Sequence, residues 1–200
     1  NDEESVVAGA GMGSMKMGFE EELRTNAARL SERGKGILAS DESTGTIGKR
    51  LVAAGLTNDE ETRRAFREVL YTAPGIGQFL SGAICFHETL YQKTADGVPF
   101  VDVMKKQGIL PGIKVDRGLK QMTNSDCGET YTEGLDGLGQ RCSEYYAQGA
   151  RFAKWRAVIK VDSKKRLPTT AAIEENAMGL AQFASIAQAN GLVCIVEPEI

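Results

Sequence analysis

The chain has 200 residues, of which 42% are hydrophobic and 26% charged, the composition of an ordinary globular protein. Its 24 basic and 27 acidic residues give a formal net charge of −3, so no general positive field favours nucleic acid, and we expect a small-molecule ligand. No run approaches the roughly 18 apolar residues of a membrane span. The single histidine excludes a multi-histidine metal site, and four scattered cysteines without a CxxC pair favour a reducing compartment.

The first part of the chain alternates helical and strand patterns. Acidic residues begin an amphipathic helix at 18–31, and an apolar strand at 34–41 follows it and ends in Asp41. Helical periodicity resumes at 44–54. The alternation continues with a helix at 57–70, a strand at 82–86, a short helix at 98–108 and a strand at 110–116.

The clearest helix pattern covers residues 57–70. Asn58 is placed to cap its N-terminus, and acidic residues fill the first turn, where the helix dipole favours them. Apolar residues at helical spacing predict its buried face: Ala65, Phe66, Val69 and Leu70.

The rest of the chain begins with a long polar loop at 117–133, followed by a helix at 134–148 and a strand at 152–161. Asn190 and Gly191 end an alanine-rich helix at 169–189, and 192–200 is the last predicted strand. One face of the alanine-rich helix is predicted to be buried: Ile173, Ala177, Leu180 and Ala184.

Three of the predicted strands each carry two charged residues that are two positions apart. Residues at this spacing point to the same face of a strand. Charges on a strand that is otherwise apolar are costly unless they are paired or belong to a polar site. The pairs, which predict such a site at the strand ends, are Lys114 with Asp116, Lys154 with Arg156, and Glu197 with Glu199.

The predicted element order is β-α-β-α-β-α-β-α-β, with nearly continuous apolar strands that are typical of parallel sheets covered by helices. A doubly wound sheet and a (β/α)8 barrel both fit this order. The charged pairs favour the barrel, because its site is assembled at the carboxyl ends of several strands. We therefore predict an α/β fold, a TIM (β/α)8 barrel of which this chain carries roughly the first five strands.

The charged pairs also suggest a chemistry. Crowded cations lower the pKa of a lysine and burial raises that of a glutamate, which suits carbonyl chemistry through amines and general acid–base transfer. A structural ion-pair network at the mouth of the barrel would give the same pattern, so both interpretations stay open. Trp155, between Lys154 and Arg156, is predicted to point the other way, into the helix layer.

The segment STGTIGKR at 43–50 resembles a phosphate-binding loop, although it begins with serine where a Walker A loop needs glycine. Ser43 and Thr46 offer hydroxyl donors, and Lys49 and Arg50 supply positive charge. The alternative is a capped helix start with exposed bases. Asp41, just before it, is either a site residue or a turn-forming residue.

Five blocks of the sequence, in order from about residue 18 to 200, resemble the class I fructose-bisphosphate aldolases. They are GKGILASDESTGTIGKRL, LYTAPGIGQFLSGAICFHETLYQ, LPGIKVDRGL, QGARFAKWRAVIK and GLVCIVEPEI. The resemblance implies reversible cleavage of fructose 1,6-bisphosphate to dihydroxyacetone phosphate and glyceraldehyde 3-phosphate through a lysine Schiff base, with no metal and no cofactor. A non-catalytic sugar-phosphate-binding or scaffold protein on the same fold is the alternative.

The resemblance also implies roles for individual residues. Asp41 matches a catalytic aspartate that handles a proton during carbon–carbon cleavage, and Glu197 matches an acid–base glutamate, with Glu199 as its neighbouring carboxylate. Lys154 matches a lysine that stabilises charge near the substrate hydroxyls, and Lys114 another lysine of the site. Residues implied in holding a substrate phosphate are Ser43, Thr46, Lys49, Arg50 and Arg156.

The segment with the Schiff-base lysine is expected beyond Ile200, so this chain alone is predicted to be inactive. We interpret residues 1–17 as a flexible leader, and residues 18–200 as the N-terminal part of one aldolase-type barrel domain that is incomplete at its C-terminus. The resemblance implies a homotetramer for the full-length protein and a cytoplasmic location, with a plastid as the open alternative.

Overall fold

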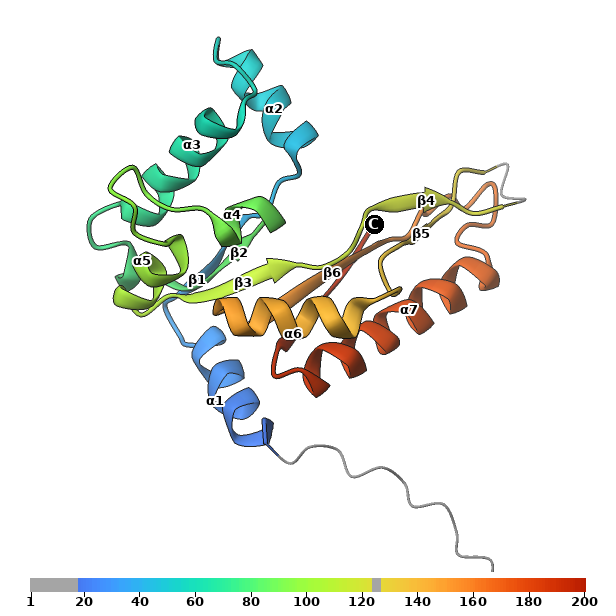
Figure 1. Cartoon of the computed structure of the whole chain (residues 1–200). Helices are drawn as coiled ribbons and strands as arrows, with labels where there is room; N and C mark the ends of the chain where they lie inside the picture. The colour runs from blue at the N-terminus through green and yellow to red at the C-terminus, as the bar shows by residue number, and fades with distance from the viewer. Residues whose placement is uncertain (1–17, 124–126) are drawn as a thin grey trace, which may run out of the picture.

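The computed structural model describes residues 18–123 and 127–200, and at its centre is one parallel five-stranded sheet (Figure 1). Neighbouring strands follow the order of the chain, β1-β2-β3-β6-β7, and each pair is parallel. A doubly wound sheet would reverse its strand order at a switch point, so the sequential order confirms the barrel prediction. The strands are β1 Gly36–Ser40, β2 Leu80–Cys85, β3 Leu110–Lys114, β6 Phe152–Val158 and β7 Val193–Glu199.

The predicted helices are also present, with ends that shift by a few residues. A short helix at His87–Tyr91 was not predicted, because five residues are too few to show helical periodicity. The predicted leader, 1–17, lies outside the described residues. The helices are α1 Glu20–Leu30, α2 Thr44–Ala53, α3 Glu60–Thr72, α4 His87–Tyr91, α5 Phe100–Lys106, α6 Leu138–Gln148 and α7 Thr170–Ala189, with a 3-10 turn η1 at Ile76–Gln78.

One face of the sheet packs against helices and forms the main core. Figure 1 shows α6 and α7 running along this side of the strands. Trp155 of β6 is 1% exposed and stacks on Phe183 of α7, with ring centroids 5.6 Å apart. The prediction that Trp155 faces the helix layer is therefore confirmed.

The opposite face of the sheet begins with an apolar floor. Phe152 of β6 packs there with Leu30 of α1, Ile84 and Leu110. A Cβ atom at Gly112 would lie 2.1 Å from the ring of Phe152, so only glycine leaves room for this ring. Two residues further along β6 the same face carries Lys154, so the apolar side chains of this face are followed by charged ones.

The predicted buried face of α3 is correct only for Leu70, which is partly buried against the core. Val69 is 69% exposed, whereas the buried residues of the helix are Arg63, Arg67 and Tyr71, four residues apart. The reason is that polar partners at the end of β1 and in α4 receive the two arginines. Charge pairing by the two arginines therefore holds this helix in place together with the apolar burial of Tyr71 in the main core.

The predicted cap of α3 is also wrong by one residue. The cap is Asp59, whose carboxylate accepts a hydrogen bond from the Thr62 amide at 2.7 Å. Asn58 instead donates to the carbonyl of Thr44 and accepts from Arg63, so its side chain joins α3 to α2.

The predicted loop 117–133 contains an antiparallel hairpin, β4 Leu119–Gln121 with β5 Thr130–Thr132. Its strands are short and polar, so they lack the alternation that marks a strand in sequence. The Thr132 hydroxyl donates to the carbonyl of Arg156 at 2.7 Å, and that of Thr130 to the carbonyl of Val158 at 3.3 Å. The hairpin therefore covers the carboxyl end of β6.

The predicted buried face of α7 is correct only in its second half. Leu180 and Ala184 pack against the core, but Ile173 is 49% exposed and Ala177 is exposed too. Asn176 occupies the buried position instead and donates to the carbonyl of Thr130 at 2.9 Å. This polar bond to the hairpin replaces the apolar contact that the pattern predicts.

Candidate active site

A cavity of about 500 Å³ opens at the carboxyl ends of the strands. Its lining comes from the segment after β1, from β3 and the turn after it, and from β6 and β7. Lys49 and Glu199 are not among the lining residues. The other predicted site residues all line it: Asp41, Ser43, Thr46, Arg50, Lys114, Lys154, Arg156 and Glu197.

Lys154 is the centre of this cavity. Its ammonium lies 2.7 Å from a carboxylate oxygen of Asp41 and 2.9 Å from one of Glu197. The side chains of Lys154 and Asp41 are each 9% exposed, and that of Glu197 is 37% exposed. Three groups from β6, the end of β1 and β7 thus meet in one charge cluster.

The expected direction of the Lys154 pKa is wrong. Burial by itself lowers the pKa of this lysine, but the hydrogen bonds and negative charges of Asp41 and Glu197 outweigh burial and raise the pKa above its ordinary value. The sequence predicted a cluster of lysines and carboxylates in which crowded cations lower the lysine pKa, whereas in the structure the carboxylates of Asp41 and Glu197 are the direct partners of the ammonium. Lys154 is therefore a protonated hydrogen-bond donor at neutral pH.

Lys114, at the end of β3, has a different partner. Its ammonium binds the Asp116 carboxylate at 2.5 Å and the Asp116 carbonyl at 2.9 Å. The same carboxylate oxygen accepts a hydrogen bond from the Gly118 amide. Asp116 thus fixes both the lysine and the turn after β3 at the wall of the cavity.

Arg156 lies on the same face of β6 as Lys154, two residues nearer the mouth. Its guanidinium pairs with the carboxylate of Glu199 on β7, two residues beyond Glu197, which is the register partner of Arg156. The hydrogen bond from Arg156 lowers the pKa of Glu199, and the same bond raises the pKa of Arg156. Glu199 therefore acts on the cavity through Arg156 rather than from its lining.

The segment 43–50 contributes a helix start. Ser43 caps α2, accepting from the Thr46 amide at 3.3 Å, and its hydroxyl lies 3.0 Å from that of Thr46. Arg50 pairs with Glu42 at 2.5 Å, while Lys49 is exposed outside the lining. The capped-helix interpretation is correct for Ser43, but this helix start still faces the cavity, where its amides favour an anion.

Glu42 was not singled out from the sequence, although it lines the cavity and binds Arg50. Its position beside Asp41, directly after a strand, was the only signal. Among the residues that the structure describes, no group of three or more His, Cys, Asp or Glu side chains is placed to hold a metal ion.

The sequential parallel strands and the charged cavity at their carboxyl ends define part of a (β/α)8 barrel with its site in the usual place. The family model for class-I fructose-bisphosphate aldolase matches residues 22–200. The chain belongs to this family.

Individual relatives agree with the family match. The chain is 58% identical over 189 residues to fructose-bisphosphate aldolase 6, cytosolic, of Arabidopsis thaliana, covering 94% of this chain and 52% of the relative. It is 56% identical over 182 residues to fructose-bisphosphate aldolase 1, chloroplastic, of Chlamydomonas reinhardtii, covering 91% of this chain and 47% of the relative.

A solved structure shows the same fold. Fructose-bisphosphate aldolase from Plasmodium falciparum, solved with TRAP and a small-molecule inhibitor, matches with a TM-score of 0.87 and 53% identity. The match covers 89% of this chain and 51% of that chain. The chain thus spans about half the length of the relatives that it matches.

Proposed function

We propose that the whole protein is a class I fructose-bisphosphate aldolase of glycolysis and gluconeogenesis. It would reversibly cleave fructose 1,6-bisphosphate to dihydroxyacetone phosphate and glyceraldehyde 3-phosphate through a lysine Schiff base. The observation that carries the proposal is the ammonium of Lys154 between the carboxylates of Asp41 and Glu197. This cluster supplies a fixed cation and two proton-transfer groups at the end of the barrel where catalysis occurs.

The reaction needs these groups in sequence. An amine condenses with the substrate ketone and releases water, and the protonated imine then accepts the electron pair of the breaking carbon–carbon bond. In the proposal, Glu197 transfers protons while the imine forms, and Asp41 handles the proton during cleavage. Lys154 stabilises negative charge near the substrate hydroxyls, for which its raised pKa keeps it protonated.

The substrate phosphate is proposed to lie where the cavity is lined by cations and by the start of α2. Arg50 and Arg156 provide charge, and Ser43 and Thr46 provide hydroxyl groups. Glu199 orients Arg156 by its ion pair. Lys49, which lies outside the lining, would contribute long-range attraction of the anion.

Neither lysine of the described cavity suits the role of the imine-forming amine. Lys154 is held protonated by two carboxylates, and Lys114 is bound by Asp116. A nucleophilic amine must instead be neutral when it attacks. We therefore assign the Schiff base to a lysine of the whole protein outside these 200 residues.

The location of the protein is proposed from the names of its relatives, and its assembly from the family resemblance alone. Several of them are named as cytosolic or cytoplasmic isozymes, which supports a cytoplasmic location. We propose a homotetramer for the whole protein, with sugar phosphates as its ligands. In the described part of the chain, the longest helices are too short or too polar to cross a bilayer.

Borohydride trapping tests the proposal. Reducing a mixture of dihydroxyacetone phosphate and the whole protein should convert the imine to a stable amine, which mass spectrometry detects as a covalent adduct on one lysine. The 200-residue chain treated in the same way should carry no adduct and show no turnover.

The contrary outcomes are equally clear. An adduct on Lys114 or Lys154 would overturn the assignment of the nucleophile. Tight binding of fructose 1,6-bisphosphate by the whole protein without any adduct or turnover would identify a sugar-phosphate-binding scaffold instead of an enzyme.

A further inference from the structure

The buried face of α3 reaches the chain segment that carries Asp41. Arg67, which is 0% exposed, donates from Nε to the carbonyl of Ser40 at 3.2 Å and from Nη2 to the carbonyl of Glu42 at 2.7 Å. These two carbonyls stand on either side of Asp41 in the chain. One guanidinium group therefore clasps the backbone before and after the proposed catalytic aspartate.

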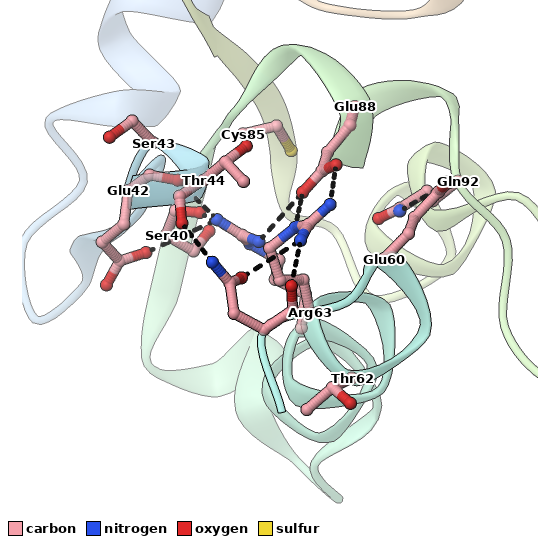
Figure 2. Close-up of polar contacts among 12 residues, drawn as sticks. Ser40, Glu42, Ser43, Thr44, Glu60, Thr62, Arg63, Cys85, Glu88 and Gln92 are labelled. Carbon is pink, nitrogen blue, oxygen red and sulfur yellow. Dashed lines mark hydrogen bonds and ion pairs between the residues drawn. The ribbon is translucent and has the colours of Figure 1, made fainter. Parts of the chain in front are cut away.

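Carboxylates on two sides balance the buried charge of Arg67. Glu88 of α4 lies 3.7 Å from its Nη1, and the Glu42 carboxylate lies 3.9 Å from its Nη2. Glu88 is itself bound by Arg63, through hydrogen bonds of 2.7 and 3.0 Å (Figure 2). A buried arginine without such partners would be costly, so this network keeps the Arg67 guanidinium in place.

The end of β1 is also tied down one turn later in α3. The hydroxyl groups of Tyr71 and Ser40 lie 2.7 Å apart, and Ser40 donates to the carbonyl of Ile84 in β2 at 2.8 Å. Figure 2 shows Ser40 and Glu42 at the edge of this polar network. Both neighbours of Asp41 are therefore anchored to α3, while the Asp41 carboxylate itself points to Lys154.

We propose that Arg67 is a positioning residue, which holds the Asp41 carboxylate against the Lys154 ammonium by fixing the carbonyl groups on both sides of Asp41. The proposal rests on the proposed aldolase function, in which Asp41 handles a proton during cleavage. Asp41 has a short side chain, so a shift of its backbone moves the carboxylate directly. The planar fork of arginine reaches two acceptors at once, which the single ammonium of lysine does not reproduce.

The test compares Arg67→Lys with Arg64→Lys in the whole protein. Arg64 lies on the same helix but pairs with Glu61 and Glu68, away from β1, so it provides a matched control. Arg67→Lys should lower kcat for cleavage by about tenfold to a hundredfold, because small displacements of a reacting group have effects of this size. The KM and the amount of borohydride-trapped imine should stay at the parent level, and Arg64→Lys should change none of these.

A second comparison separates positioning from a general structural role. In the Asp41→Asn background, adding Arg67→Lys should slow cleavage no further, because Arg67 acts through Asp41. Parent-level kcat in Arg67→Lys would overturn the proposal. An equal loss of turnover and trapped imine, or additive losses in the double variant, would do so too, since each indicates damage to the whole site.

Amide hydrogen exchange tests the positioning role of Arg67 without depending on enzyme activity. Amide hydrogen exchange of residues 40–43 should be about tenfold faster in Arg67→Lys than in the parent or Arg64→Lys, because the two hydrogen bonds from Arg67 to the carbonyls of Ser40 and Glu42 are lost. If the parent protein forms no imine, the aldolase proposal fails. Faster exchange in Arg67→Lys would still show that Arg67 fixes the backbone around Asp41. Unchanged exchange in Arg67→Lys would overturn the positioning role of Arg67, whatever the activity of the variant.

Discussion

At the scale of single residues, Lys154 shows how a charge becomes tolerable on a buried strand. Phe152 precedes it on the same face and belongs to the apolar floor, and Arg156 follows it towards solvent. Between these surroundings, Lys154 is neutralised by Asp41 and Glu197. These ion pairs offset the cost of burying the lysine. They also hold the two carboxylates close together, and the carboxylates would repel each other if the lysine were absent.

Lys154→Met tests this mutual dependence. We expect the free energy of unfolding at pH 7 to fall by about 2 kcal/mol, less than for a fully buried pair because the partly exposed Glu197 is screened by water. Turnover of the whole protein should fall by about a hundredfold or more, since a fixed cation is lost. Urea unfolding and steady-state kinetics measure the two effects.

The control is the double variant Lys154→Met with Asp41→Asn. Removing one of the two uncompensated carboxylates should restore part of the lost stability but none of the activity. Equal stabilities of Lys154→Met and the parent would show that the ion cluster contributes nothing to the fold.

At the scale of elements, α3 supports the site although it contributes no residue to the cavity lining. Its buried Arg67 and Tyr71 bind the end of β1, and its N-terminus is capped by Asp59. Hydrogen bonds from the Thr57 side chain, the Thr62 amide and the Thr62 side chain lower the pKa of the Asp59 carboxyl from 3.8 to about 2. The cap is thus charged, and most effective, throughout the neutral range.

Asp59→Ala should therefore lower Tm by about 2–4 °C at neutral pH, because α3 loses its cap and the favourable charge at its start. The folded-state pKa is depressed, so the stabilisation is present above pH 3.8 and is lost as the pH falls through about 2. The Tm difference between parent and variant should narrow over that interval. Thermal scans between neutral and acid pH follow it, with Asn58→Ala as the control.

A constant difference across the whole pH range would contradict the charged-cap account. A larger effect of Asn58→Ala at neutral pH would show instead that the bond from Asn58 to α2 matters more than the cap.

At the scale of the whole molecule, the five-stranded sheet has two edges, β1 and β7. Each edge strand has a single neighbour in the described structure, and β7 carries Val196, which is 46% exposed. An exposed strand edge pairs readily with other chains. The edge of β7 is therefore a surface on which a strand of a second copy of the chain could pair.

We expect the 200-residue chain, produced alone, to self-associate through the edge of β7. Val196→Lys should shift its mass distribution in analytical ultracentrifugation towards the monomer, because lysine on an edge strand opposes pairing. Val69→Lys, which replaces a 69% exposed valine on α3, is the matched control and should leave association unchanged. Equal effects of the two variants would indicate general repulsion rather than edge pairing.

The sequence was sufficient where a local pattern carries the physics. Apolar strands predicted the sheet, and charges two residues apart predicted side chains that line the cavity, with Glu199 as the exception, because both follow from the alternation of a strand. It failed where a partner lies far along the chain. The buried arginines of α3 and the raised pKa of Lys154 depend on acids from other elements, and no periodicity within α3 or β6 reports those acids.

The contact between Lys154 and Asp41 also measures the curvature of the sheet. β6 and the end of β1 are separated by β2 and β3, so on a flat sheet their backbones would stand about 14 Å apart, with side chains rising in parallel. The two side chains nevertheless meet at 2.7 Å. A sheet that curves towards this face brings the two side chains together. The salt bridge therefore links strands on opposite sides of the curved sheet, and its presence shows that the sheet is strongly curved.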